Sequence, residues 1–344
     1  MASETLLAVE NLSIALPAGA DRAHAVEEVS FSVAANQIVC LVGESGSGKS
    51  MTAHAILSLL PDRVRIASGA LRFRGRDIAD LDEASMRALR GGEIAMIFQE
   101  PMSALNPLAR IGDQISEAIE THARPLPSRE AIDARVLELV TSVGLPDPPS
   151  IVRSFPFQLS GGQRQRVMIA MAMANNPALL LADEPTTALD VTTQKQILGL
   201  IRDLQASRGM GVLLITHDFG VVADMADHVV VMRDGRVVEQ GPVDEVLRRP
   251  RHEYTRTLIA AVPGGRPPEP KAREVGHAPV LAASGLSKTF STRQGFFRPP
   301  RIVHAVRDVA LSLAARETVA VVGESGSGKS TLGRMVMRLV EPDA

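Results

Sequence analysis

The sequence is poor in cysteine and in aromatic residues. Of its 344 residues one is cysteine (Cys40) and one is tyrosine, and there is no tryptophan. A single cysteine cannot form a disulfide within the chain, so we expect a small buried apolar side chain in a protein of a reducing compartment. With aromatic residues at 3%, a platform on which nucleic-acid bases stack is not expected.

Strong charge of one sign and long apolar runs are also missing. The formal net charge is -2, and no basic stripe marks a surface for nucleic acid, so no nucleic-acid partner is expected. No apolar run approaches the roughly 20 residues of a membrane-spanning helix, and the N-terminus carries acids where a signal peptide carries bases. The sequence predicts a soluble cytoplasmic protein that would be held at a membrane only by partners.

An internal repeat is the most informative feature present. Residues 24–53 align without gaps with residues 304–333, with about 17 of the 30 positions identical, and such self-similarity indicates duplicated units. A proline- and glycine-rich stretch over 263–279 indicates a linker. We therefore expect a complete first domain over 1–262 and an N-terminal fragment of a second such domain over 280–344, because about 65 residues cannot enclose a comparable core.

The first domain is predicted to be α/β. Short apolar runs alternate with helical patterns, which is typical of a mostly parallel sheet covered by helices. A hairpin turn is expected at 233–236, a small antiparallel β element over 70–78, and an inserted helical subdomain over about 108–175, where prolines break the helical stretches. The predicted sheet strands are Ile38–Val42, Ile94–Phe98, Leu179–Ala182, Val212–Thr216 and Val229–Met232.

A glycine-rich segment between the first strand and a helical run fits the pattern G-x-x-x-x-G-K-[ST]. It consists of Gly43, Glu44, Ser45, Gly46, Ser47, Gly48, Lys49 and Ser50. Its small residues let backbone N–H groups turn toward phosphate oxygens at the positive end of a helix. Lys49 would add a positive charge on the β- and γ-phosphates, and the Ser50 hydroxyl would coordinate Mg²⁺.

The same pattern recurs in the second copy, which argues against a glycine-rich turn that binds nothing. Its residues are Gly323, Glu324, Ser325, Gly326, Ser327, Gly328, Lys329 and Ser330, followed by Thr331. We expect this segment to be a second phosphate-binding loop, with Ser330 as its metal ligand.

Two acids follow the predicted strand Leu179–Ala182. Strands of such a sheet deliver their carboxyl ends to the edge where nucleotide binds. Asp183 is therefore expected to hold Mg²⁺, and Glu184 to orient or deprotonate the attacking water. Two acids after a strand more often belong to a solvated loop, but the phosphate-binding loop upstream favours the functional interpretation.

The segment 159–163 reads Leu-Ser-Gly-Gly-Gln and precedes a helix expected over Arg164–Ala174. Ser160 is a natural N-cap, and the glycine N–H groups offer a second anion site, although a simple helix cap fits these residues equally well. The pentapeptide resembles the signature motif of ABC ATPases. Further family elements follow in order, since Gln99 stands where the Q-loop does and His217 where the switch histidine does, and 188–190 resembles the D-loop.

The resemblance covers 1–262 and 280–344, and it implies a RecA-like P-loop NTPase that uses ATP and Mg²⁺. It assigns catalytic roles to Glu184, His217 and Gln99, with Gln99 also contacting the metal. Two ATPase domains of this family close face to face, so the signature residues Ser160, Gly161, Gly162 and Gln163 would contact nucleotide held by the other domain's loop. That second domain would belong to the same longer chain or to a second copy.

The residue that packs on adenine differs between the copies. Family members stack adenine on an aromatic side chain upstream of the phosphate-binding loop. The second copy offers Phe290 in that region, whereas the first offers Leu16 or Ala20. Weaker or less base-selective binding is therefore expected at the first site.

Two stretches narrow the resemblance. Residues 98–107 look like the Q-loop region of oligopeptide, dipeptide and nickel importer ATPases, and 252–256 is similar to their His-Pro-Tyr-Thr-Arg tail, with Glu253 replacing proline. An amphipathic closing helix also accounts for that tail. The resemblance implies an energy-coupling subunit of an importer for peptides or similar small solutes, peripheral on the cytoplasmic face of the inner membrane.

Its implied partners are two integral membrane permease subunits, docking around Gln99 and 108–158, and an extracytoplasmic solute-binding protein reached through the complex. The alternative is a soluble ABC ATPase that acts on ribosomes or DNA. The short proline-rich linker, the absence of heptads and the slightly negative net charge argue against this alternative.

Overall fold

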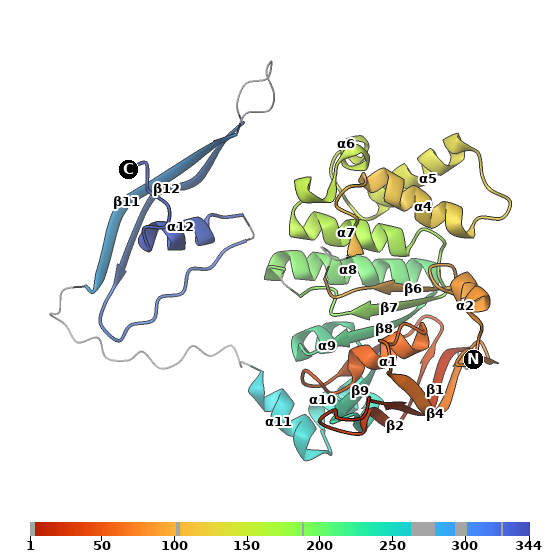
Figure 1. Cartoon of the computed structure of the whole chain (residues 1–344). Helices are drawn as coiled ribbons and strands as arrows, with labels where there is room; N and C mark the ends of the chain where they lie inside the picture. Colours follow the sequence, from red (N-terminus) through yellow and green to blue (C-terminus); the bar gives the residue numbers. More distant parts are fainter. Residues whose placement is uncertain (1–3, 101–103, 188, 263–278, 293–300, 325) are drawn as a thin grey trace. The chain divides into compact units, whose positions relative to one another are not determined.

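The computed structural model describes residues 4–100, 104–187, 189–262, 279–292, 301–324 and 326–344. The chain forms two compact units, the larger made mainly of residues up to 264 and the smaller mainly of residues 265–344 (Figure 1). The predicted linker lies outside the described residues except for Pro279.

A six-stranded sheet with the order β10-β9-β3-β8-β7-β6 forms the centre of the larger unit. Its neighbours pair in parallel except for β10, which is antiparallel to β9. The sheet strands are β3 (Ile38–Val42), β6 (Ile94–Ile97), β7 (Leu179–Asp183), β8 (Gly211–Thr216), β9 (His228–Arg233) and β10 (Arg236–Pro242). β3, β7 and β8 are buried at every position. All five predicted sheet strands are present, and their ends differ from the prediction by at most one residue.

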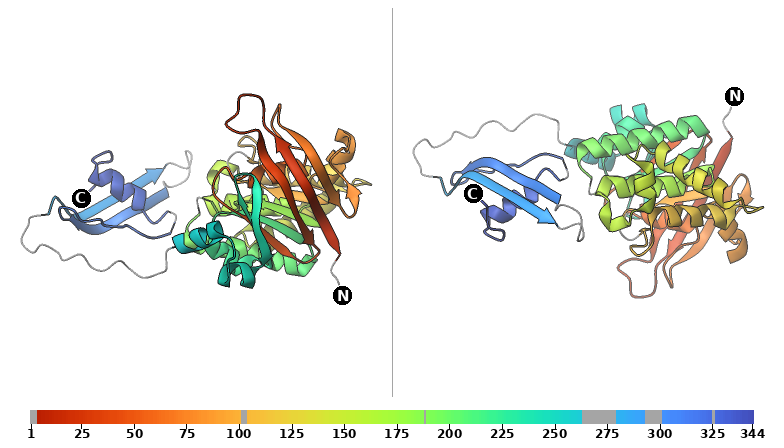
Figure 2. Two further views of the ribbon diagram at one scale, coloured as in Figure 1. Left: turned by 90° about the horizontal axis from the view of Figure 1, so that it is seen from below. Right: turned by 90° about the horizontal axis from the view of Figure 1, so that it is seen from above.

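An antiparallel sheet with the order β2-β1-β4-β5 makes a second β layer, which crosses one side of the larger unit in the view from below (Figure 2). Its strands are β1 (Thr5–Ala15), β2 (His24–Ala34), β4 (Arg65–Phe73) and β5 (Arg76–Asp77). The prediction of one β element over 70–78 was wrong in its bounds. The first half of β4 is mostly exposed, so it shows no alternation that would mark a strand, and it is held by pairing with β1. β1 and β2 were not predicted as strands.

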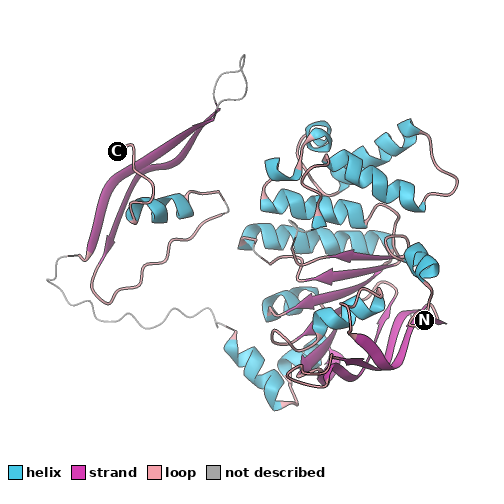
Figure 3. Cartoon of the chain, viewed as in Figure 1, coloured by secondary structure: helices cyan, strands magenta, loops and turns pink. Residues whose placement is uncertain are grey.

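A cluster of helices follows β6 and precedes β7, next to the β6 edge of the sheet (Figures 1 and 3). Its members are α4 (Ile111–His122), α5 (Arg129–Ser142), α6 (Pro148–Arg153), the 3-10 turn η1 (Pro156–Gln158) and α7 (Gly161–Ala172). The predicted start of α7 at Arg164 was wrong. The helix begins at Gly161 because the Ser160 side chain caps it there, accepting from the backbone N–H of Gln163.

The other described helices of the larger unit lie outside this cluster. They are α1 (Lys49–Ile56), α2 (Glu83–Leu89), α8 (Val191–Arg208), α9 (Phe219–Met225), α10 (Val243–Arg248) and α11 (Glu253–Ala261). A continuous apolar core joins the two sheets through α1, and Leu12, Leu41 and Ile56 are fully buried in it. Among the residues described, none of the helices combines the length and apolar character needed to cross a membrane.

The smaller unit is a long hairpin with one helix. β11 (Leu281–Thr292) pairs antiparallel with β12 (Arg301–Leu313), and α12 (Lys329–Val336) follows. Its core is small and centres on Val306, Leu332 and Met335. Residues 317–324, which repeat the sequence leading into the first loop, are not assigned to a strand.

Candidate nucleotide-binding site

The loop from Gly43 to Ser50 joins the buried strand β3 to α1. Gly43 has φ 151°, and a Cβ there would collide with the backbone carbonyl of Met232. No other residue type fits, because the loop packs this closely on β9. The Lys49 side chain folds back over the loop, and its Nζ donates to the carbonyls of Gly43 and Glu44, each at 2.8 Å.

Two side-chain oxygens that could bind a metal lie close together at the C-terminal end of this loop. The Ser50 hydroxyl, at the start of α1, donates to Asp183 Oδ1 at 3.1 Å. Asp183 ends β7 and is 4% exposed. Burial raises the pKa of Asp183, while the hydrogen bond from Ser50 opposes that rise. A hydroxyl and a carboxylate therefore lie side by side where the loop would present phosphate.

Glu184 is held by side chains from three neighbouring strand ends. Its Oε2 accepts from Gln99 Nε2 at 2.9 Å and from Thr187 Oγ1 at 2.9 Å, and its Oε1 lies 2.8 Å from His217 Nδ1. Gln99 follows β6 and His217 follows β8, on either side of β7. The parallel order of the strands thus gathers all three predicted catalytic residues.

The surroundings of Glu184 keep it ionised. Burial acts to raise its pKa, but hydrogen bonds from His217 and Thr187, with the positive charge of Lys49, outweigh this and hold the pKa below its usual value. Burial in turn lowers the pKa of Lys49, against the attraction of Glu184 and Asp183. Near neutral pH the site therefore holds a carboxylate next to the phosphate-binding loop.

The predicted signature residues lie at the start of α7. Ser160 and Gln163 hydrogen-bond each other at the start of α7, with Ser160 N donating to Gln163 Oε1 at 2.9 Å and Gln163 N to Ser160 Oγ at 3.2 Å. A Cβ on Gly162 would lie 2.6 Å from Thr193 Cγ2. Gly161 is the first residue of the helix. Ala188 of the predicted D-loop lies outside the described residues.

The second loop repeats the conformation of the first in the smaller unit. Gly323, Gly326 and Gly328 have φ 154°, 82° and 93°. Lys329 Nζ donates to the carbonyls of Gly323 and Glu324, each at 2.7 Å. Ser327 lies between Gly326 and Gly328, just before α12. That helix contains Ser330 and Thr331. Ser325 lies outside the described residues.

The candidate adenine contacts differ between the two copies. Phe290 lies on β11 with 42% of its surface exposed, and Lys288 Nζ lies 5.9 Å from the centre of its ring. In the larger unit Leu16 packs against the core, and Ala20 is exposed.

Sequence reasoning missed two side chains that touch the first loop. Tyr254, on α11, accepts a hydrogen bond from the backbone N–H of Glu44 at 3.2 Å. Arg22 donates from Nη2 to the carbonyl of Gly46 at 2.5 Å. Tyr254 falls in the segment 252–256, which resembles the tail of importer ATPases. No local pattern connects it with a loop 210 positions away. Nothing in the sequence marks Arg22.

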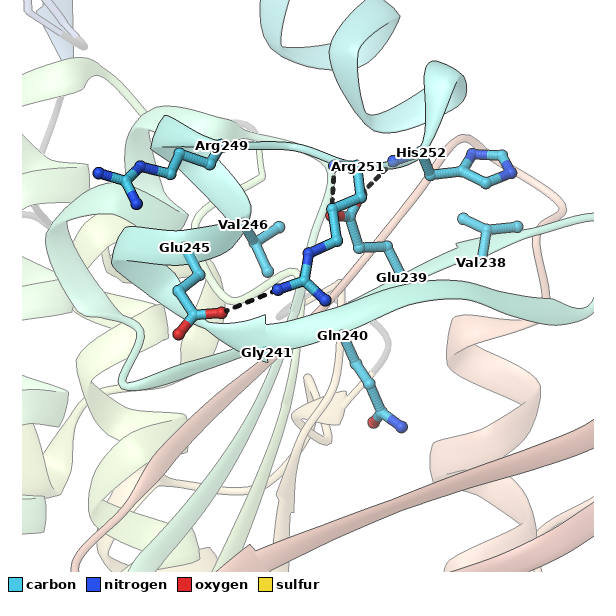
Figure 4. Close-up of a pocket in the computed structure, with 9 residues that line it drawn as sticks. All are labelled: Val238, Glu239, Gln240, Gly241, Glu245, Val246, Arg249, Arg251 and His252. Atoms are coloured by element: carbon cyan, nitrogen blue, oxygen red, sulfur yellow. Dashed lines mark hydrogen bonds and ion pairs between the residues drawn. The ribbon is translucent and has the colours of Figure 1, made fainter.

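A separate hollow of about 730 Å³ lies between β10, α10 and the start of α11 (Figure 4). None of the predicted site residues lines it. Three of its charged residues contact one another: Arg251 Nη2 lies 3.7 Å from Glu245 Oε2, and Glu239 accepts from the backbone N–H groups of Arg251 and His252.

Comparison with known proteins identifies the class. Residues 26–187 and 306–344 match the family model of the ABC transporter, and residues 238–296 match that of the oligopeptide/dipeptide transporter C-terminal region. The chain belongs to the ABC transporter ATP-binding proteins of the oligopeptide/dipeptide group.

Two curated relatives are longer than this chain. It is 48% identical to the peptidoglycan transport ATP-binding protein YejF of Agrobacterium fabrum, over 98% of this chain and 61% of that protein. It is 46% identical to the glutathione import ATP-binding protein GsiA of Shigella dysenteriae, over 98% of this chain and 58% of that protein. The chain thus spans about three fifths of the length of these relatives.

Solved structures confirm the predicted fold class. The dimeric post-hydrolysis state of the ATP-binding cassette MJ0796 bound to ADP and Pi superposes with a TM-score of 0.63 at 29% identity, covering 69% of this chain and 99% of that one. CbiO1 from Clostridium perfringens, part of the cbiONQ transporter complex, gives a TM-score of 0.61 at 26% identity, covering 75% of this chain and 96% of that one. The P-loop fold of a mostly parallel sheet, an antiparallel β layer and helices is therefore confirmed.

Proposed function

We propose that this chain is an ATP-hydrolysing energy-coupling subunit of an ABC importer for peptides or similar small solutes, glutathione among them. The observation that carries this proposal is the convergence of Gln99, Glu184 and His217 beside the paired Ser50 and Asp183, at the edge of the parallel sheet where the phosphate-binding loop emerges.

The loop of 43–50 binds the phosphates of ATP. Backbone N–H groups at the start of α1 face the phosphate oxygens, and Lys49 places its ammonium on the β- and γ-phosphates. Mg²⁺ fits the oxygens of Ser50, Asp183 and the Gln99 amide, and at the second loop that of Ser330. Within the described ranges no group of three or more His, Cys, Asp or Glu side chains could cage a metal. Such sparse coordination suits Mg²⁺, which keeps waters and shares substrate phosphates; when bound, it would neutralise charge on the β- and γ-oxygens.

Glu184 accepts the proton of the attacking water or orients that water. Its lowered pKa keeps it a carboxylate at neutral pH, which is the form this role requires. His217, which contacts Glu184, would bind the γ-phosphate. Release of the Gln99 or Thr187 hydrogen bond would free Oε2 for the water.

A second ATPase domain completes each nucleotide site. Residues 160–163 form the capped start of α7, and the solved relative is dimeric. We propose that 1–262 is a whole ATPase domain with its helical subdomain over 108–175, and that 263–279 is a linker. Residues 280–344 would begin a second domain, as the repeat and the greater length of the relatives suggest.

ATP binding would close the domain pair, and hydrolysis and product release would reopen it. That motion would switch two integral membrane permeases, which in turn receive solute from an extracytoplasmic binding protein. The subunit would sit peripherally on the cytoplasmic face of the inner membrane, with the surface around Gln99 and 108–158 against the permeases.

The test is to purify the tagged full-length protein from detergent-solubilised membranes and identify what accompanies it by mass spectrometry. Two multi-span membrane proteins are expected, with ATPase activity that rises when the reconstituted complex receives glutathione or short peptides together with its binding protein. Recovery of ribosomes or DNA-bound proteins without a membrane partner would overturn the importer function.

A further inference from the structure

The single tyrosine of the chain reaches the phosphate-binding loop from the C-terminal end of the larger unit. Tyr254 is 7% exposed, and its hydroxyl accepts from the backbone N–H of Glu44 at 3.2 Å. Glu44 is the second residue of the loop. The hydroxyl therefore takes up a backbone donor on the side of the loop that faces α11.

The turn between β9 and β10 backs the same side of the loop. The carbonyl of Met232 presses against Gly43, and Gly235 N donates to the carbonyl of Ser47 at 3.2 Å. The guanidinium carbon of Arg233 lies 4.9 Å from the centre of the Tyr254 ring, a cation–π distance. Ring, guanidinium and turn thus form one wall behind the loop, and the tyrosine hydroxyl is the part of α11 that bonds to it.

The start of α11 is itself fixed to β10. Glu239 accepts from Arg251 N at 2.7 Å and from His252 N at 3.1 Å (Figure 4). His252 Nδ1 then accepts from Tyr254 N at 3.1 Å, which caps the helix. These bonds set the position of Tyr254 two residues downstream, so the tyrosine is held rigidly from its backbone side.

We infer that Tyr254 is a positioning residue for nucleotide binding, which holds the peptide at Glu44 and preorganises the phosphate-binding loop. This inference rests on the proposed binding of ATP by that loop. A loop already held in its binding conformation loses less conformational freedom when the ligand arrives. The oligopeptide-type C-terminal region, matched over 238–296, would then contribute to the nucleotide site and not only close the domain.

The test compares Tyr254→Phe with the wild-type full chain. Phenylalanine keeps the ring against Arg233 and removes one acceptor. The matched control is Thr257→Val, which deletes a hydroxyl from the same helix, where it bonds only to the Glu253 carbonyl on the exposed side. The measurements are the dissociation constants of ADP and a non-hydrolysable ATP analogue, the melting temperature, and hydrogen exchange of residues 43–48 without nucleotide.

For Tyr254→Phe we expect nucleotide affinity to fall about two- to tenfold, the range of one net hydrogen bond, with KM raised and kcat unchanged. Exchange at 43–48 should quicken while exchange in the rest of α11 stays the same. Glu239→Gln should act in the same direction and more weakly. Thr257→Val should change none of these.

Equal affinity and equal loop exchange in wild type and Tyr254→Phe would overturn the inference. So would a lower melting temperature with unchanged affinity, because that is the mark of a purely structural tyrosine. If Tyr254→Phe folds poorly, Glu239→Gln decides the matter by the same loop exchange. A wild-type chain that binds neither nucleotide would instead refute the proposed function.

Discussion

The two copies of the repeat place nearly the same sequence in two different surroundings. In both, the glycine-rich loop has positive φ at its three glycines, and the lysine bonds to the two carbonyls at the start of the loop. The segment before the loop differs. Residues 38–42 form a strand with every position buried, whereas Val321 and Val322 are 47% and 86% exposed and belong to no strand.

The comparison separates local from distant causes. The loop conformation follows from its own glycines and its lysine, so it survives a change of surroundings. The strand needs partners, because its backbone groups must be paired when they leave water. β3 has β8 and β9 on its two sides, and the described part of the smaller unit has no counterparts of them. The conformation of the loop is therefore set locally, whereas that of the strand before it depends on neighbouring strands.

The largest expected effect comes from removing the carboxylate of Glu184 in the first copy. Glu184→Gln should lower ATP turnover by a factor of about a hundred or more, while nucleotide affinity stays near wild type. The measurement is steady-state phosphate release beside equilibrium binding of ATP. Unchanged hydrolysis would remove Glu184 from the mechanism, and Glu245→Gln, an exposed glutamate outside the site, is the matched control.

Removing the lysine from each loop in turn tests whether they are equivalent. In the 344-residue chain Lys49→Ala should weaken ATP binding at least about tenfold, because a buried ammonium on two phosphates is lost. Lys329→Ala should leave binding by the larger unit near wild type. Calorimetric titration of both variants checks this. Equal losses in the two would show that the second loop binds nucleotide as well as the first.

Substitutions in the segments that precede the two loops should differ in their effect on the free energy of unfolding. Leu41 is fully buried and occupies the repeat position of Val321. Leu41→Ala should cost about 2–5 kcal/mol of unfolding free energy, and Val321→Ala less than about 0.5 kcal/mol. Urea unfolding followed by circular dichroism gives both values. A comparable cost at Val321 would mean that its segment is packed in solution.

The smallest expected effect concerns Glu239, which fixes the start of α11 through hydrogen bonds from Arg251 N and His252 N. Burial acts to raise the pKa of Glu239, but hydrogen bonds, led by the one from the Arg251 N–H, outweigh it and hold the pKa below its ordinary value. Its contribution to stability is therefore present at neutral pH and lost as pH falls through the lowered pKa. Glu239→Gln should melt a few degrees below wild type at pH 7, and the gap should close below about pH 4.5.

The control for this last prediction is Glu245→Gln in the same hollow. That glutamate is 64% exposed and lies 3.7 Å from Arg251, so its loss should change the melting temperature little at any pH. If the melting temperature of Glu239→Gln stayed below that of wild type by the same amount down to acid pH, the charge of Glu239 would not be what holds residues 251–252.

Local patterns predicted much of the fold and part of the candidate site. Buried parallel strands are continuous apolar runs, so all five were predictable, and the residues that follow them share one sheet edge by topology alone. β1 and β2 were missed because their stability depends on each other and on the half-exposed β4. The start of α7 was misplaced because two glycines obscured a helix that Ser160 caps. Tyr254 and Arg22 were missed because they meet the loop only through the tertiary fold.

The burial of Cys40 has a practical consequence for spectroscopy. It is the chain's one cysteine, lies within β3 and is fully buried, and burial, reinforced by Asp227, raises the pKa of its thiol. Maleimide reagents attack exposed thiolates, so the native protein should stay unlabelled. A cysteine introduced at an exposed site such as Phe157 or Leu126 would then carry a dye or spin label at one known position. Movement of the helix cluster α4–α7 relative to the main sheet could then be followed in real time without first removing a native thiol.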